Sequence, residues 1–434
     1  MKPTFIISCP IDTYSGYGAR SRDLVKAIIE LDKYDVKIMP QRWGNCPWNF
    51  IKNNNKKWGF LNKHLLPKGA PLSVKPDIWA QITVPNEFQP VGKYNIGFTA
   101  GIETTIVNPE WVVGMNRMDI NFVSSQHSKD VFVNSIFEQR DQRTNQVTGE
   151  VKLTKPTEVL FEGIDLDTYF PKKSTFDLNG IEENFAYLFL GHWMKGNIGE
   201  DRKNVGLLVH SFFNTFKNKK KAPALILKTS GVGASYMDRD YILDKIYQVR
   251  GTIEGAKSLP NVYLLHGEFT DEEINELYNH KKVKAMVSLT KGEGFGRPLL
   301  EFTQTKKPVI TTNWSGHTDF LSPEFTTLIS GDLNQVHESA ASDLLMKESQ
   351  WFSPNIGEFS YYLRDMFENY KTYTEKAVRQ AYKSKKEFSF DQMKSKLDNY
   401  LTNAIPDFPK EVKLKLPSKA AKIKLPKIKK LENV

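Results

Sequence analysis

Cysteine is scarce in this sequence: Cys9 and Cys46 are the only two among 434 residues. Neither belongs to a Cys-x-x-Cys pair or a similar short spacing, which excludes a Cys-based zinc site and a disulfide framework. We expect two unpaired structural thiols, as is usual for proteins of a reducing cytoplasm.

Long apolar runs are absent as well. The first residues, MKPTFIISCPID, hold one lysine before a short apolar stretch that Pro10 interrupts. This stretch is too short for a signal peptide, and no later window reaches the about 20 apolar residues of a membrane-spanning helix. We therefore expect a cytoplasmic protein, and peripheral attachment to a membrane or another polyanionic surface stays open.

The carboxylates of the sequence form no cluster that would mark a metal site.

Charge is unevenly distributed along the chain. The net charge is +10, and residues 410–434 hold nine lysines and two glutamates, so +7 of it falls in this segment. The lysines alternate with Val, Leu and Ile between prolines, which predicts a disordered tail over 406–434. Such a tail attracts nucleic-acid phosphates or anionic lipids, and a solvated tail without a partner is the alternative.

Buried strands alternate with helices through most of the sequence. The strand FIISC (5–9) is followed by the glycine loop DTYSGYGARS (12–21) and by a helix that gathers apolar residues on one face. The alternation resumes from FAYLFLG (185–191) to PVITT (308–312). This order is typical of parallel sheets covered by helices. Because 434 residues exceed one ordinary core, we expect two α/β domains.

Three glycines and two glutamates fall in one short segment, GEGFGRPLLEF (292–302). It follows a predicted strand, and Pro298 suits the first turn of a helix, so the loop lies where parallel sheets bind ligands. Glycines permit close backbone approach, a helix start favours phosphate, and carboxylates accept from paired sugar hydroxyls. The alternative is a tight structural turn in which Glu301 complements the helix dipole.

The longer segment SLTKGEGFGRPLLEFTQTKKPVITTNWSGHTDFL (288–321) closely resembles the donor-binding signature of family 4 retaining glycosyltransferases of the GT-B fold. The two signature glutamates of that family are separated by seven residues, as Glu293 and Glu301 are. The segments ETTIVNPEW (103–111), VLFEGIDLDTYFP (159–171) and DRKN (201–204) are similar to other parts of the family, in the same order. The resemblance spans roughly residues 5–400 and is most specific over 285–320.

The resemblance implies an α/β fold of two Rossmann-like parallel-sheet domains that face each other across a cleft. Residues 1–170 would form the acceptor domain and 171–375 the nucleotide-sugar donor domain, with the turn-rich stretch 162–177 between them. Helices over 376–405 would pack back onto the first domain. The activity implied is transfer of a hexose or related sugar from a nucleoside diphosphate sugar to an acceptor hydroxyl, with retained configuration.

The same resemblance assigns roles to individual residues. Glu301 would accept from ribose hydroxyls, and Glu293 with the backbone of 294–296 would contact the transferred sugar. Arg202 and Lys203 would neutralise the leaving diphosphate, which makes a metal ion or other cofactor unnecessary. The implied catalytic set is Glu293, Lys203, Arg202 and Glu103. The implied donor-binding set is Gly16, Gly18, Arg202, Lys203, Glu293, Gly294, Phe295, Gly296, Arg297, Glu301 and His317.

Two departures qualify these assignments. Relatives usually carry Gly-Arg where this sequence has Gly191-His192, so we expect Arg202 to hold the phosphate. Glu103 stands where many relatives have a histidine. We expect it to orient the acceptor or the sugar, and the alternative is a carboxylate at a helix start or on the surface without a role in the site. We assign no protein nucleophile, because the leaving phosphate is expected to take the proton of the acceptor.

Two other functions compete with sugar transfer. GYGARS has Ser21 where a dinucleotide fingerprint needs a third glycine, which disfavours an NAD enzyme. A non-catalytic GT-B scaffold that binds nucleic acid or a membrane surface through its lysine tail is the runner-up. The sequence leaves open the base, the sugar, the oligomeric state and the acceptor, which would be a polysaccharide, a lipid carrier, a protein or DNA.

Overall fold

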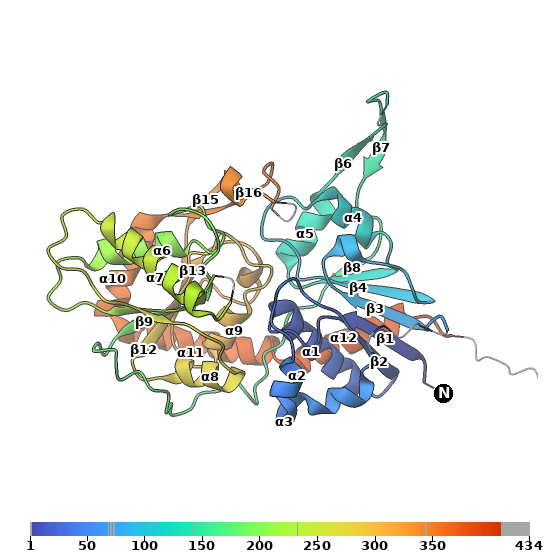
Figure 1. Ribbon diagram of the computed structural model, residues 1–434, viewed down its shortest axis with the longest axis horizontal. Coiled ribbons are helices and arrows are strands. Elements are labelled where there is room, and N and C mark those ends of the chain that lie inside the picture. The colour runs from blue at the N-terminus through green and yellow to red at the C-terminus, as the bar shows by residue number, and fades with distance from the viewer. Residues whose placement is uncertain are drawn as a thin grey trace, which may run out of the picture.

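The computed structural model describes residues 2–408 except 68, 70, 71, 73, 142, 232, 343 and 344. Two six-stranded parallel sheets organise this part of the chain, one in each of the two lobes seen in Figure 1. Their strand orders are β2-β1-β3-β4-β5-β8 and β11-β10-β9-β12-β13-β14. The predicted α/β fold class with two Rossmann-like sheets is confirmed.

The first sheet holds β1 (Thr4–Cys9), β2 (Asp35–Pro40), β3 (Ile78–Ile82), β4 (Tyr94–Phe98), β5 (Ile120–Val123) and β8 (Thr157–Val159). Its helices are α1 (Gly16–Glu30), α2 (Phe50–Asn53), α3 (Asn55–Trp58), α4 (Pro109–Met115) and α5 (Gln126–Asn134), with the short turns η1 (Gly59–His64) and η2 (Pro85–Glu87). The hairpin β6 (Phe137–Arg140) and β7 (Val147–Val151) projects from this lobe in Figure 1.

The second sheet holds β9 (Ala186–His192), β10 (Ala224–Ser230), β11 (Val262–Leu265), β12 (Val283–Val287), β13 (Val309–Thr312) and β14 (Thr327–Ile329). Its helices are α6 (Val205–Phe216), α7 (Tyr236–Gly251), α8 (Asp271–Asn279), α9 (Arg297–Thr303) and α10 (Ile356–Glu368), with the short turns η3 (Gly316–Asp319) and η4 (Glu338–Ala340). An antiparallel pair, β15 (Gly331–Gln335) and β16 (Gln350–Pro354), borders this lobe.

The central strands are buried on both faces, which explains their almost continuous apolar sequences. In β1, the successive residues Phe5 and Ile6 point to opposite faces and both are buried, as are Leu188 and Phe189 of β9. Helices on the two faces of each sheet provide the covering layers. No described helix is long and apolar enough to cross a membrane.

The chain passes between the two lobes at two places that touch each other. Ile164 donates its backbone N–H to Phe388 at 2.8 Å, and Phe390 donates its own to Ile164 at 2.8 Å. Helix α11 (Tyr370–Glu387) lies against α9, and α12 (Phe390–Ala404) lies against α1 of the first lobe. In Figure 1 these last helices run along both lobes. The lysine-rich tail was predicted over 406–434, and residues 409–434 of it lie outside the described residues.

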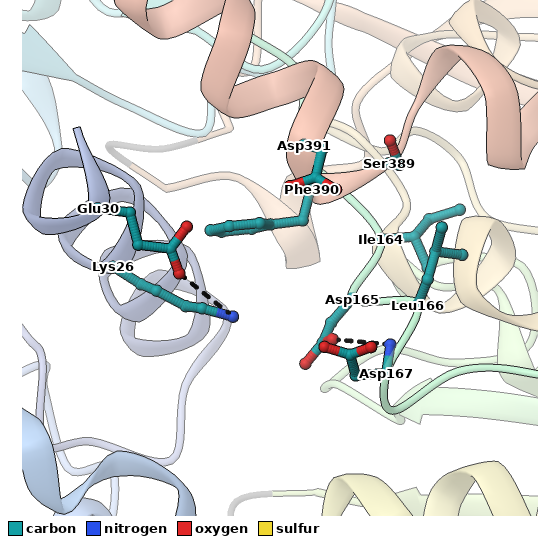
Figure 2. A pocket seen from close by; sticks show the side chains of 9 residues that line it. All are labelled: Lys26, Glu30, Ile164, Asp165, Leu166, Asp167, Ser389, Phe390 and Asp391. Carbon is teal, nitrogen blue, oxygen red and sulfur yellow. Dashed lines mark hydrogen bonds and ion pairs between the residues drawn. The ribbon is translucent and has the colours of Figure 1, made fainter.

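Figure 2 shows a pocket of about 170 Å³ at this crossing, lined by parts of α1, the segment 164–167 and the start of α12. Three of its charged groups have partners nearby, since Lys26 pairs with Glu30 at 3.9 Å and Asp165 pairs with Lys57 at 2.9 Å. None of the predicted site residues lines it. We interpret the pocket as a packing gap where the chain changes lobes.

Candidate functional site

The second sheet reverses its strand order between β9 and β12, because β10 and β11 extend to one side and β13 and β14 to the other. Open α/β sheets bind ligands at such a point, beyond the carboxyl ends of the strands. The loop after β9 carries Arg202 and Lys203, and the loop after β12 carries Glu293. The two loops therefore lie side by side at the expected ligand-binding edge.

The four predicted catalytic residues form one charged cluster. Lys203 Nζ lies 2.6 Å from Glu293 Oε1 and 3.8 Å from Glu103 Oε1, and Arg202 pairs with the same Glu103 oxygen. Glu103 belongs to the first lobe, so the cluster joins the two domains. Glu103 Oε2 is buried and has no hydrogen-bond partner among the described residues, which leaves an acceptor for a ligand hydroxyl.

The neighbouring cations decide the charge of Glu293. Burial by itself would raise the pKa of this carboxyl, but Lys203 and then Arg202 outweigh burial and hold the pKa below its ordinary value. Glu293 is therefore ionised at neutral pH. Burial would likewise lower the pKa of Arg202, but Glu103 and Glu293 raise it overall. The Glu293 carboxylate and the Arg202 guanidinium therefore both stay charged in this cluster.

Two glycines of the loop lie in close contact with the backbone of the first lobe. A Cβ atom at Gly292 would collide with the carbonyl oxygen of Glu103, and one at Gly294 would lie 2.6 Å from that of Ala100. Gly296 precedes α9 with a φ of 93°, which glycine adopts without strain. At Gly292 and Gly294, only glycine allows the observed contact between the domains.

His317 lies behind the glycine loop and is fully buried. Its Nε2 donates to the carbonyl of Thr312 at 2.6 Å, and burial lowers its pKa, so the ring is neutral. Nδ1 is therefore an acceptor, and it has no partner among the described residues. The Cβ of His317 lies 3.0 Å from the place of a Cβ at Gly296, which puts the histidine beside the loop.

Glu301 and Arg297 pair with each other on α9. Arg297 Nε donates to Glu301 Oε1 at 2.7 Å, and Arg297 Nη1 donates to Asp23 on α1 at 2.6 Å. Burial raises the pKa of Glu301 to about 7 against the opposing effect of Arg297. Phe295 turns its side chain into the core against Phe320, with ring centroids 5.1 Å apart, so only its backbone can meet a ligand.

The glycine loop of the first lobe forms the start of α1. Ser15 caps the helix by accepting from the N–H of Gly18 at 2.9 Å, and a Cβ at Gly18 would collide with the carbonyl of Thr13. Gly16 has open space around it. The Tyr17 hydroxyl accepts from the N–H of Ala100 at 3.1 Å, which ties this loop to the wall that Gly294 contacts.

Lys291 and Asp23 are two site residues that the sequence interpretation missed. Lys291 is 4% exposed, burial lowers its pKa to about 8, and its Nζ lies 4.4 Å from the centre of the Trp351 ring. Its N–H donates to the carbonyl of Arg202 at 3.1 Å, so it fixes the loop that carries the two cations. A single lysine before Gly292 gives no sequence signal for this role.

Residues 252–350 match the family model of the group 1 glycosyl transferases. This segment includes β12, the glycine loop, α9 and β13. The match confirms the predicted enzyme class, a glycosyltransferase. No curated protein matches the sequence at a significant level. Among the described residues, no group of three or more His, Cys, Asp or Glu side chains is placed to hold a metal ion.

Solved structures share the two-domain arrangement. HepE from Anabaena, in complex with UDP and glucose, is 13% identical, with 92% of this chain and 100% of that chain covered and a TM-score of 0.58. A glycosyltransferase from Rickettsia africae is 12% identical over 94% of this chain and 100% of that chain, with a TM-score of 0.59. Sucrose-phosphate synthase from Thermosynechococcus elongatus is 10% identical, with 93% of this chain and 99% of that chain covered and a TM-score of 0.57. These likenesses establish the predicted GT-B fold.

Proposed function

We propose that the protein is a retaining, metal-independent glycosyltransferase whose donor is a nucleoside diphosphate sugar. One observation carries the proposal: Arg202 and Lys203 meet Glu103 and Glu293 at the strand-order reversal of the second sheet. The segment that matches the group 1 glycosyl transferases, residues 252–350, includes Glu293 of that cluster.

The two cations suit the leaving group of this reaction. Cleavage of the bond between the anomeric carbon and the diphosphate develops negative charge on phosphate, and fixed cations in a water-poor site stabilise it. A diphosphate competes with Glu103 and Glu293 for Arg202 and Lys203. Once it binds the cations, the carboxylates become available to accept from hydroxyls of the transferred sugar.

Glu301 is the proposed acceptor for the ribose. Arg297 occupies its Oε1, and the described residues supply no hydrogen bond to its second carboxylate oxygen. The amide groups of Gly294 and Gly296, Phe295 between them, and the imidazole Nδ1 of His317 complete the donor-binding wall. Gly16 and Gly18 approach the diphosphate from the start of α1, where the helix dipole favours an anion.

The protonation state of Glu293 supports front-face transfer with retention. A general base works best with a pKa near the working pH, whereas Lys203 and Arg202 hold the pKa of Glu293 below its ordinary value. Glu293 is thus a weak base. We propose that the leaving phosphate oxygen takes the proton of the acceptor hydroxyl, and that Glu293 positions the sugar.

A donor screen in the presence of EDTA tests the proposal. We expect release of the nucleoside diphosphate from one sugar nucleotide in a panel of UDP-, GDP- and ADP-sugars, with a rate that EDTA leaves unchanged. UDP-glucose is the first donor to try, because it is the ligand of one HepE structure. Release that stops in EDTA and returns with Mg²⁺ would contradict metal independence. Absence of release and binding across the panel would contradict the enzyme and favour the polyanion-binding scaffold.

The lysine-rich segment motivates a second part of the proposal. The charge of residues 410–434 suits a polyanionic acceptor or surface. We place this partner in the cytoplasm, because its reducing conditions keep thiols such as the two free cysteines unpaired. Truncation after residue 405 is expected to weaken binding to anionic vesicles or DNA and to flatten its salt dependence, while donor hydrolysis stays unchanged. Equal vesicle and DNA binding of both chains across a salt series would refute this part.

A further inference from the structure

One arginine connects the donor-side helix to the opposite domain. Arg297 is the first residue of α9, and its guanidinium binds Glu301 through Nε at 2.7 Å and Asp23 through Nη1 at 2.6 Å. Glu301 belongs to the same helix, whereas Asp23 lies on α1 of the first lobe. Both carboxylate side chains are 7% exposed and the Arg297 side chain is 20% exposed, so the bridge is largely buried.

The surroundings of the bridge are also charged and buried. Arg20 on α1 donates to the carbonyl of Phe161 at 2.7 Å, and Glu162 lies buried beside it. Glu301 further faces Asp271 and the hydroxyl groups of Tyr169 and Tyr278. Removal of one charge from such a group leaves its partner buried without compensation, which makes every member sensitive to substitution.

The geometry of the guanidinium makes this bridge dependent on the distance between the domains. Its N–H groups form a rigid planar fork, so it can bind Glu301 and Asp23 together only when α1 and α9 are at their present spacing. If the domains separate, the contact with Asp23 breaks first, because Glu301 stays four residues away on the same helix. Arg297 then loses the partner that fixes its orientation.

We propose that Asp23 is a positioning residue for the donor: by holding Arg297 from the first domain, it sets the Glu301 carboxylate in the orientation that receives the ribose of the nucleoside diphosphate sugar. This inference rests on the function proposed above. Because coupling between two equilibria is reciprocal, ribose binding at Glu301 favours the closed arrangement of the domains, and closure strengthens donor binding. Asp23 thus links donor binding to domain closure without touching the donor.

The test is a calorimetric titration with UDP-glucose, or with the donor that the screen selects, using the full-length protein. Asp23→Asn removes the charge and keeps the shape, and Arg297→Lys keeps the charge and removes the fork. Asp32→Asn is the matched control, because Asp32 follows α1 and its side chain is 88% exposed. We expect Asp23→Asn and Arg297→Lys to weaken donor binding about tenfold and the control to leave it unchanged.

Two further readouts distinguish positioning from mere stabilisation. The double variant should bind no more weakly than Arg297→Lys alone, because both substitutions break one bridge. Donor binding by the wild type should weaken as the pH falls through about 7, where Glu301 becomes protonated. The negative charge of Asp23 helps to raise the pKa of Glu301, so Asp23→Asn should move this inflection to lower pH.

The outcomes separate the two levels of the proposal. If the wild type binds no sugar nucleotide at all, the proposed function fails, and this inference fails with it. If the wild type binds its donor and folded Asp23→Asn binds equally well with the same pH profile, the positioning role of Asp23 is overturned and the function stands. If Asp23→Asn does not fold, Arg297→Lys decides, and unchanged binding by that variant overturns the inference.

Discussion

Replacement of Lys203 by alanine is expected to lower the rate of sugar transfer by about 10²- to 10³-fold, or roughly 2.7–4 kcal/mol of transition-state stabilisation. Lys203 Nζ lies 2.6 Å from Glu293 and 3.8 Å from Glu103. Its loss removes one cation from the leaving diphosphate and leaves both carboxylates facing that anion. The substitution should therefore weaken donor binding as well as slow the chemical step.

Initial rates over a range of donor concentrations measure this effect. Lys195→Ala is the matched control, because Lys195 is exposed in the same loop after β9. We expect this control to keep wild-type kinetics. A second variant, Lys203→Ala with Glu293→Gln, removes one uncompensated carboxylate and should recover part of the donor affinity but not the rate. A folded Lys203→Ala enzyme with kcat and KM close to the wild type would refute the role of the cation.

Replacement of Gly292 by alanine is expected to reduce kcat/KM by about 100-fold, the size of effect that a misplacement of about 1 Å produces. The added methyl group would collide with the carbonyl of Glu103 in the opposite domain. The two loops must then separate, which displaces Glu103 from Arg202. Because Arg202, Lys203 and Glu301 all belong to the second domain, donor affinity should fall less than the rate, by about the tenfold expected when the Asp23 contact is lost.

Steady-state rates and a separate donor titration distinguish these two effects. Gly251→Ala is the control, because a Cβ at this position at the end of α7 would have no heavy atom within 4 Å. The control variant should be as stable and active as the wild type. Full activity of Gly292→Ala would mean that the contact between the glycine loop and the first domain is irrelevant to catalysis.

The strands were predictable because burial on both faces imposes nearly continuous apolar runs. FIISC was predicted as a strand, and β1 spans Thr4–Cys9. Pro298 was predicted as the first helical residue, and α9 begins one residue earlier at Arg297. Such small shifts at helix ends are ordinary, because the first turn lacks internal hydrogen bonds.

The charged cluster was predictable only in part. Glu293 and Lys203 belong to local segments with a recognisable pattern, so their meeting could be expected. The bridge between Asp23 and Arg297 spans 274 positions of the sequence, and no periodicity or spacing indicates such a pair. The same holds for Lys291, whose partner Trp351 lies on β16. Contacts between segments far apart in the sequence depend on how the elements and the two domains pack together, which local patterns do not encode.

The glycine loop shows a second limit of sequence interpretation. Its glycines were predicted to let a ligand approach, but Gly292 and Gly294 also let the first domain approach, at Glu103 and Ala100. Phe295 was predicted to contact the donor through its backbone, and the sequence did not indicate that its side chain packs on Phe320 in the core. A glycine pattern reveals that something comes close to the backbone. It does not reveal whether that neighbour is a ligand, another domain or both.

A crystal structure of the protein with its selected donor, grown in the presence of EDTA, tests the central claim most directly. We predict the diphosphate within about 3 Å of the Arg202 and Lys203 side chains, the ribose at Glu301 and the sugar beside Glu293, with no metal ion between them. A donor bound away from these two cations, for instance in the pocket of Figure 2, or a diphosphate that leaves Lys203 paired with Glu293, would contradict the proposed mechanism.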